Sequence, residues 1–273
     1  MSKTNIIAEI GINHNGDIEI AKKLINIAAF AGCDYVKFQK REPDICVPDE
    51  QKSIIKETPW GKMTYLDYKK KIEFGKDEYE EIANYSNSVG IKWFASVWDK
   101  PSVDFCSNMT GIGKIPSALI NDVELIAYAR SKFDTLLLST GMSTENEIEK
   151  AFKICKPDVI FHTNSTYPSP IQELNLNYIK WLKEKYQNTQ IGYSGHEFGL
   201  VTTYAAVALG ASWIERHVTL DREMWGSDQK SSVEPTGVIK LVNGIRAIEL
   251  SLGKSEPRVL LESEKIKKNS LRK

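Results

Sequence analysis

The sequence has none of the features that direct a chain into a membrane or an oxidising compartment. It contains no run of about 18 apolar residues and no apolar stretch after a basic start, which argues against a membrane span and a secretory signal. Its four cysteines include no C-x-x-C pair, and each lies in or beside an apolar pattern typical of a buried thiol. They are Cys33, Cys46, Cys106 and Cys155. We therefore expect a cytoplasmic protein with reduced thiols.

An excess of charge of one sign is also lacking. The 273 residues include 36 basic and 36 acidic side chains, which argues against a general attraction to nucleic acid or to anionic membranes. Apolar residues at 41% and charged residues at 26% are ordinary for a globular protein. The length is compatible with one α/β barrel. We expect neither a nucleic-acid partner nor a membrane partner.

A short β-rich run followed by an amphipathic helix pattern recurs along the chain, roughly every 30 to 40 residues, as in a parallel sheet built from βα units. Eight such units can be counted. The predicted strands cover residues 6–10, 35–38, 93–97, 112–115, 135–139, 159–162, 190–193 and 213–218. The predicted helices include residues 18–31, 78–88, 122–131, 145–155, 178–186 and 200–208. This spacing favours a (β/α)8 barrel, or TIM barrel, over a sandwich.

Local signals support these boundaries. Thr144 followed three residues later by Glu147 forms a capping box at the start of a helix. Gly32, Gly90 and Gly210 fall where helices should stop.

The domain organisation predicted is one catalytic barrel over residues 1–254. Its last helix should begin near Pro235, because proline suits the first turn of a helix. Residues 255–273 are charged and carry no apolar period, so they are interpreted as a surface helix or linker. Residues 40–75 form the longest insert, and a loop after the second strand is expected to overhang the active-site mouth.

Polar residues stand at the carboxyl ends of all eight predicted strands. In a barrel such residues converge on one pocket, whereas deeper inward residues are branched and apolar. The polar residues are Glu9, Lys37, Gln39, Ser96, Lys114, Ser117, Ser139, His162, Asn164, Ser165, Ser194, His196 and His217. The sequence therefore predicts an active site at this rim.

Two lysines are prominent among these strand ends. Lys37 lies in an apolar Tyr-Val-Lys-Phe run and shares a strand face with Gln39, while Lys114 ends another strand. An inward lysine needs an anion, so the two ammonium groups and the serine hydroxyls suit a small ligand with phosphate and carboxylate groups. The alternative is that one lysine pairs with Glu9 or extends along apolar surface to water.

Two histidines, His196 and His217, end consecutive strands and lie 21 residues apart. Their imidazoles could share one divalent ion, with water or substrate oxygens completing an octahedral site like that of Mn²⁺. The alternative is a pair of buried, hydrogen-bonded histidines, and His14 and His162 suit such structural roles equally. Residues 224–228, Met-Trp-Gly-Ser-Asp, suit a polyol substrate or form an ordinary loop.

Six stretches, in order, resemble the N-acetylneuraminate (sialic acid) synthase family, which includes the legionaminic and pseudaminic acid synthases. They are residues 7–16 (IAEIGINHNG), 36–39 (VKFQ), 138–142 (LSTGM), 167–170 (YPSP), 192–196 (GYSGH) and 215–219 (ERHVT). The similarity extends from about residue 5 to residue 252. So many ordered motifs make the resemblance highly specific.

The resemblance implies a transferase of nonulosonic acid biosynthesis. It would condense phosphoenolpyruvate with a 2-acetamido sugar aldehyde such as N-acetylmannosamine, and release phosphate by carbon–oxygen cleavage. It also implies a divalent metal, usually Mn²⁺ with Mg²⁺ or Co²⁺ as alternatives, held by His196 and His217. The metal would polarise the aldehyde for attack by C3 of phosphoenolpyruvate and position the water that attacks C2.

The resemblance also assigns roles to the strand-end residues. Phosphoenolpyruvate would be held by Lys37, Ser96, Lys114, Ser117, Ser139, Ser165 and Ser194. The sugar would be faced by Gln39, Tyr167 and Asp228. The catalytic residues would be Glu9, His196 and His217, and the role of Glu9 stays open between general acid/base and electrostatic.

Two departures from the family pattern leave the acceptor open. Many members continue into a small antifreeze-like domain whose arginine reaches the sugar in the partner subunit's barrel, whereas this chain stops at Lys273. Leu119 occupies a position where some members carry a glutamate. The acceptor could be a different aldose, or the domain could be a separate chain. A homodimer would have to rest on barrel surfaces.

Two other classes of protein fit the residues. One is a metal-dependent barrel aldolase or isomerase that uses a Schiff-base lysine or the two histidines without phosphoenolpyruvate. The other is a non-catalytic barrel subunit that needs a separate partner domain. The presence of the lysines, the hydroxyls and both histidines argues against a decayed site.

Overall fold

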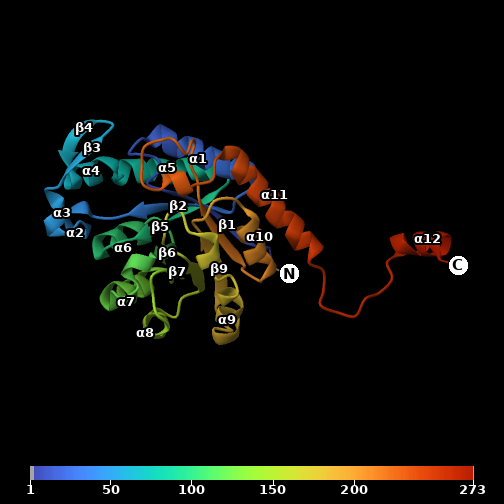
Figure 1. The fold of residues 1–273 in the computed structure, drawn as a ribbon. Coiled ribbons are helices and arrows are strands. Elements are labelled where there is room, and N and C mark those ends of the chain that lie inside the picture. The colour runs from blue at the N-terminus through green and yellow to red at the C-terminus, as the bar shows by residue number, and fades with distance from the viewer. Residues whose placement is uncertain (1–2, 273) are drawn as a thin grey trace.

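The computed structural model describes residues 3–272 and contains a closed barrel of eight parallel strands (Figure 1). The barrel strands are β1 (Asn5–Gly11), β2 (Tyr35–Lys40), β5 (Lys92–Val97), β6 (Ile112–Ile115), β7 (Thr135–Ser139), β8 (Val159–Thr163), β9 (Gln190–Gly195) and β10 (Trp213–His217). β1 pairs with both β2 and β10, which closes the barrel. The predicted TIM barrel is confirmed, with a strand at each of the eight predicted positions.

Helices surround the barrel and connect its strands. They are α1 (Ile18–Ala31), α5 (Lys76–Ser88), α6 (Lys100–Ser107), α7 (Val123–Lys132), α8 (Glu145–Cys155), α9 (Tyr178–Lys185), α10 (Val201–Ala208) and α11 (Pro235–Ser251). Short 3-10 turns lie at η1 (Ser117–Leu119), η2 (Ile171–Glu173) and η3 (Gln229–Ser231). Helix α6 was not predicted, because a helix of eight residues with few buried apolar positions has almost no detectable period.

Two of the local signals act as expected. The Thr144 amide donates to the Glu147 carboxylate over 2.7 Å, and the Glu147 amide donates to Thr144 Oγ1 over 3.4 Å. These bonds satisfy amides that the first turn of α8 leaves free. Gly32 ends α1 with φ of 88°, a left-handed conformation that glycine adopts at low cost.

An apolar cluster fills the barrel interior below the carboxyl rim. It is formed by Ile7, Tyr35, Phe94, Leu137, Val159, Phe161 and Trp213, all at most 9% exposed. A second, larger cluster lies between the strands and the helices. The interior is therefore a packed core, and only its carboxyl end is left for polar side chains.

The insert after β2 is structured. It contains α2 (Pro43–Cys46), α3 (Asp49–Lys52), β3 (Ile55–Thr58), β4 (Gly61–Thr64) and α4 (Tyr65–Ile72), which gather at one end of the molecule (Figure 1). β3 and β4 form an antiparallel pair that the sequence did not predict. Tyr68 and Trp60 pack against Trp225 of the loop after β10, with ring centroids 5.0 and 5.8 Å apart. The insert thus lies on the carboxyl side of the barrel.

The segment after α11 leads away from the barrel and ends in α12 (Glu262–Leu271) (Figure 1). The division of the chain near residue 254 stays a prediction.

Cys33, Cys106 and Cys155 are buried free thiols, whereas Cys46 is only half-buried beside Asp99. Among the helices that the structure describes, none combines the length and the hydrophobicity needed to cross a bilayer.

Candidate active site

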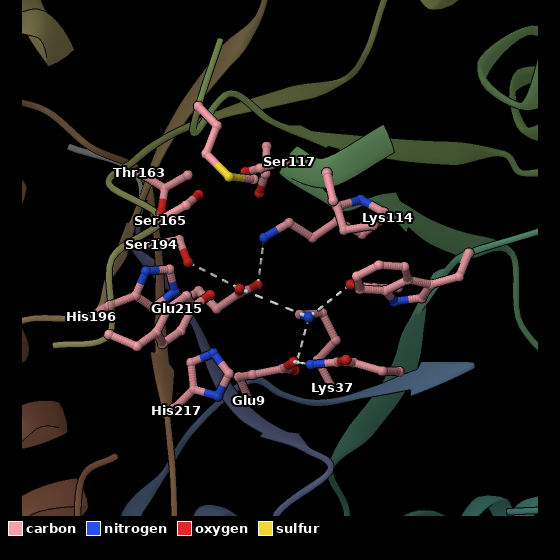
Figure 2. Close-up of a pocket in the computed structure, with 18 residues that line it drawn as sticks. Glu9, Lys37, Lys114, Ser117, Thr163, Ser165, Ser194, His196, Glu215 and His217 are labelled. Atoms are coloured by element: carbon pink, nitrogen blue, oxygen red, sulfur yellow. Dashed lines mark hydrogen bonds and ion pairs between the residues drawn. The ribbon is translucent and has the colours of Figure 1, made fainter. Parts of the chain in front are cut away.

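A cavity of about 210 Å³ opens at the carboxyl ends of the strands (Figure 2). Each barrel strand contributes at least one polar side chain to it. These side chains are Glu9, Lys37, Gln39, Ser96, Lys114, Ser139, Thr163, Ser194, Glu215 and His217. Loop residues complete the lining, among them Trp98, Ser117, Met142, Ser165, Tyr167 and His196.

The alternation of side chains along a strand places these groups in the cavity. On β1, Ile7 belongs to the interior apolar cluster and Glu9, two residues on, faces the cavity. On β10 the same step of two leads from Trp213 to Glu215 and then to His217. The apolar plug and the polar rim are therefore successive layers of the same inward face.

The structure brings together almost every residue that the sequence analysis assigned to the site. Of the residues to which the resemblance gave a role, only Asp228 does not line the cavity, and of the other strand-end residues His162 and Asn164 do not line it either. Asp228 lies just behind, with its carboxylate 3.8 Å from His217 Nδ1. Leu119 lies in η1 and packs against the outer core, so it does not face the cavity.

The floor of the cavity is a cluster of two lysines and two glutamates, which we call the charge quartet. Lys37 Nζ lies 2.8 Å from Glu9 Oε2 and 3.8 Å from Glu215 Oε1, and Lys114 Nζ lies 2.7 Å from Glu215 Oε2 (Figure 2). All four side chains are at most 5% exposed. Ser96 accepts a 2.8 Å hydrogen bond from Lys37. The alternative interpretation, a lysine paired with Glu9, is therefore realised by Lys37.

Glu215 is the main residue to which sequence reasoning gave no role. It carries the charge that balances Lys114, and Ser194 also donates a hydrogen bond to it over 3.1 Å. The sequence did contain a signal for its place in the site, because Glu215 lies two positions before His217 and must share its strand face. Trp98, Met142 and Thr163 were missed as well, because none of them carries an ionisable group that would draw attention.

Burial and mutual charge set the protonation of the quartet. Burial raises the pKa of Glu9 above its usual range, and Lys37 offsets this only in part. Burial favours a raised pKa for Glu215 too, but the charges of Lys114 and Lys37 outweigh it and lower this pKa to about 2. Burial lowers the pKa of Lys114 to about 8. Glu9 is thus the quartet carboxyl that most readily holds a proton.

The imidazoles of His196 and His217 face one side of the cavity, with ring centroids 5.3 Å apart (Figure 2). His196 Nδ1 lies 2.6 Å from the Asn164 carbonyl, which requires a proton on Nδ1 and leaves Nε2 as an acceptor. Burial lowers the pKa of His196 to about 3, helped by His217. Tyr167 stacks on His196 at 4.1 Å and meets His217 edge-on at 5.8 Å.

This arrangement fits a divalent metal. A neutral imidazole is the form that ligates metals, and a carbonyl on the other ring nitrogen is the usual partner that fixes its orientation. His217 Nδ1 is buried with no hydrogen-bond partner among residues 3–272. No group of three His, Cys, Asp or Glu side chains positioned for a metal occurs in that part of the chain. The protein would therefore supply two ligands, and water or substrate the rest.

The other two histidines lie outside the cavity. His14 stacks on Phe74 at 3.9 Å, and its Nδ1 accepts the Gly16 amide over 3.1 Å. His162 Nε2 lies 2.6 Å from the Leu174 carbonyl. Both therefore have the structural surroundings that the sequence analysis allowed for them.

Fold and site together define a class of protein: a TIM barrel with a buried floor of paired lysines and glutamates and an imidazole pair at the carboxyl rim. The NeuB family model matches residues 24–257. The chain belongs to the NeuB family, and its relatives include an N-acetylneuraminate-9-phosphate synthase and an N,N'-diacetyllegionaminic acid synthase.

Individual relatives show how far the likeness extends. The N-acetylneuraminate-9-phosphate synthase of Homo sapiens is 35% identical over 262 residues, which cover 93% of this chain and 73% of that protein. The N,N'-diacetyllegionaminic acid synthase of Campylobacter jejuni is 36% identical over 93% of this chain and 78% of its own length. A crystal structure of the sialic acid synthetase of Leptospira borgpetersenii, with citrate, superposes with a TM-score of 0.87 at 33% identity, covering 99% of this chain and 93% of that one.

Proposed function

We propose that this protein condenses phosphoenolpyruvate with an open-chain 2-acetamido sugar aldehyde to give a nonulosonic acid and phosphate. C3 of phosphoenolpyruvate forms a bond to the aldehyde carbon, whose oxygen takes up a proton and becomes a hydroxyl. Water adds at C2, and the bond between C2 and the bridging oxygen breaks. That oxygen leaves with the phosphate, and a six-carbon acceptor yields a nine-carbon 2-keto acid.

The observation that carries this proposal is the charge quartet beneath a ring of hydroxyls. Lys37 and Lys114 present two ammonium groups to the cavity, and Ser96, Ser139 and Ser194 line it around them. With Glu9 protonated, two cations face only the carboxylate of Glu215, so the floor attracts an anion with two charged ends. Ser117 and Ser165 extend the same donor set toward the phosphate.

The sugar would lie above this floor, between Tyr167, Gln39 and the loop that carries Asp228. Tyr167 offers a ring face for the carbon skeleton, and Gln39 and Asp228 offer hydrogen bonds to hydroxyls. We propose an acetamido sugar like N-acetylmannosamine, and the names of the relatives, synthases of N-acetylneuraminate-9-phosphate and of N,N'-diacetyllegionaminic acid, support this choice. The aromatic ring and the hydrogen-bonding groups proposed for this side of the pocket are compatible with the acceptor sugars of both kinds of synthase.

His196 and His217 would hold the divalent cation, for which we propose Mn²⁺. When bound, such a cation supplies Lewis-acid polarisation of the aldehyde oxygen. Asn164 keeps the proton of His196 on Nδ1, and Tyr167 covers the imidazoles from water. The chain therefore orients both ligands before any substrate arrives.

Glu9 would move the proton. Burial raises its pKa and so favours the protonated form, and its Oε1 lies 3.2 Å from the Gln39 amide on the side where the sugar would lie. It can donate to the aldehyde oxygen as the carbon–carbon bond forms. Lys37, bound to the same carboxylate, then favours the ionised form.

The decisive experiment is a phosphate-release assay with Mn²⁺, phosphoenolpyruvate labelled with ¹⁸O at the bridging position, and a panel of acetamido sugars. We expect release only when all three components are present, with the label in the phosphate. Label retained in the sugar product would show cleavage of the other bond. A panel that gives no phosphate with any acceptor would refute the proposed activity.

A further inference from the structure

The backbone hydrogen bonds between β9 and β10 stop just short of the imidazole pair. The last residues that pair are Gly195 and Arg216, so His196 already belongs to the loop that leads to α10. Contacts from Asn164 and Ser169 hold His196 to the loop after β8, but neither reaches β10. The distance between the imidazoles therefore needs another constraint.

The side chain of Arg216 supplies it. Its guanidinium donates to the Glu197 carbonyl over 2.6 Å, to the Gly199 carbonyl over 2.9 Å and to Thr203 Oγ1 over 2.7 Å. Arg216 is 1% exposed, so water does not compete for these bonds. One side chain of β10 thus binds the backbone that directly follows His196.

The carboxylate of Glu197 completes the connection from the other side. It lies 3.3 Å from Arg216, is fully buried, and accepts hydrogen bonds from Tyr193 and Thr202 over 3.0 and 2.6 Å. A Cβ at Gly195 would lie only 2.7 Å from Glu197 Oε2. The carboxylate therefore occupies a space that only a glycine at this strand end leaves open.

Strand alternation places this ion pair directly behind the imidazoles. Glu215 and His217 line the cavity, so Arg216 between them points to the outer side of β10. Arg216 is the neighbour in sequence of one imidazole, and Glu197 is the neighbour of the other. The ion pair of Arg216 and Glu197 therefore lies on the outer side of the ends of β9 and β10, and the imidazole pair lies on the cavity side.

We propose that Arg216 and Glu197 are positioning residues that set the spacing of His196 and His217 for a divalent cation. The inference rests on the proposed function, because it takes both histidines as ligands. A buried ion pair adds little net stability compared with apolar residues of the same shape, so stability alone does not account for it. Metal ligands must be held within about 0.5 Å of their productive geometry. The guanidinium of Arg216, bonded to the carbonyls of Glu197 and Gly199, holds the backbone next to His196 in this way.

The test measures Mn²⁺ affinity by electron paramagnetic resonance of free Mn²⁺, together with the melting temperature. Arg216→Lys keeps the charge but loses the fork that spans two carbonyls. Arg216→Met with Glu197→Leu removes both charges and so avoids an unpaired buried ion. We expect Arg216→Lys and the double variant each to weaken Mn²⁺ binding about 10- to 100-fold. The Mn²⁺ affinity of Glu197→Gln should lie between that of these two variants and that of the unmodified protein.

Asp34→Asn is the matched control. Asp34 pairs with Arg246 over 3.1 Å and accepts the Ile6 amide over 2.9 Å, at the amino end of the barrel. We expect Asp34→Asn to lower the melting temperature and to leave the Mn²⁺ affinity unchanged. If Arg216 were merely structural, its variants would show this same pattern.

The outcomes separate this inference from the proposed function. Folded Arg216→Lys and double variants that bind Mn²⁺ as tightly as the unmodified protein would overturn the positioning role and leave the metal site intact. An unmodified protein that binds no Mn²⁺ would overturn the metal site and, with it, the inference. An equal loss in Asp34→Asn would show a general effect of stability and overturn the positioning role as well.

Discussion

Replacing Lys37 by methionine tests most sharply the proposal that the floor of the cavity binds an anion. In the free protein its ammonium group lies 2.8 Å from both Glu9 and Ser96 and is 3% exposed. A charge-assisted hydrogen bond of this kind contributes about 1.5 to 3 kcal/mol to ligand binding. Methionine removes that contribution and keeps most of the volume, so the KM for phosphoenolpyruvate should rise about 10- to 150-fold.

The same substitution leaves Glu9 buried without its partner. Breaking a buried ion pair usually costs about 3 to 5 kcal/mol, but a Glu9 that holds a proton avoids most of that cost. Because burial raises the folded-state pKa of Glu9, the protonated form is favoured at low pH, and the stability it gives is lost as the pH rises. The Lys37→Met variant should therefore be least destabilised at and below pH 4.5, the ordinary pKa of a glutamate, and progressively more destabilised as the pH rises above it.

Lys40→Met provides the control on the same strand. Lys40 pairs with Glu73 over 3.1 Å and does not line the cavity. We expect it to lower the melting temperature without changing the KM for phosphoenolpyruvate. If Lys37→Met left phosphoenolpyruvate dependence unchanged, or Lys40→Met raised the KM equally, the assignment of Lys37 to the anion site would be wrong.

Three further outcomes are expected. His217→Ala should abolish Mn²⁺-dependent phosphate release with a near-normal circular dichroism spectrum, and a variant with full turnover would remove His217 from the site. Because burial lowers the pKa of Lys114 to about 8, phosphoenolpyruvate affinity should fall as the pH rises through that value. Calorimetry in buffers of different ionisation enthalpy should then show proton uptake on binding, and its absence would contradict the assignment. Thr144→Ala should lower the free energy of unfolding of the barrel by about 1 kcal/mol in a denaturant titration, since it removes the cap of α8, and should leave kinetics unchanged.

The barrel was predictable because its units repeat. Eight buried β-rich runs, each followed by a helix period, leave few alternatives to a closed parallel sheet. What the sequence could not give were elements without a period, namely α6 and the exposed strands of β3 and β4. Their short length and exposed residues leave no pattern to detect.

The site was predictable for a different reason. In a barrel, polar residues at strand ends must converge, so Lys37, Lys114, His196 and His217 could be grouped from position alone. A pairing of Lys37 or Lys114 with Glu9 could be named as an alternative, but the actual partner of Lys114 could not be inferred in this way. That Lys114 pairs with Glu215 depends on where two distant strands place their inward residues, which only the closed geometry decides.

The central claim is that one cavity binds a divalent cation at its imidazoles and phosphoenolpyruvate at its lysines. A crystal soaked with Mn²⁺ and phosphoenolpyruvate tests both parts at once. We predict anomalous density for Mn²⁺ between His196 and His217, with phosphoenolpyruvate contacting Lys37 and Lys114. Metal bound elsewhere, or phosphoenolpyruvate away from both lysines, would contradict the account.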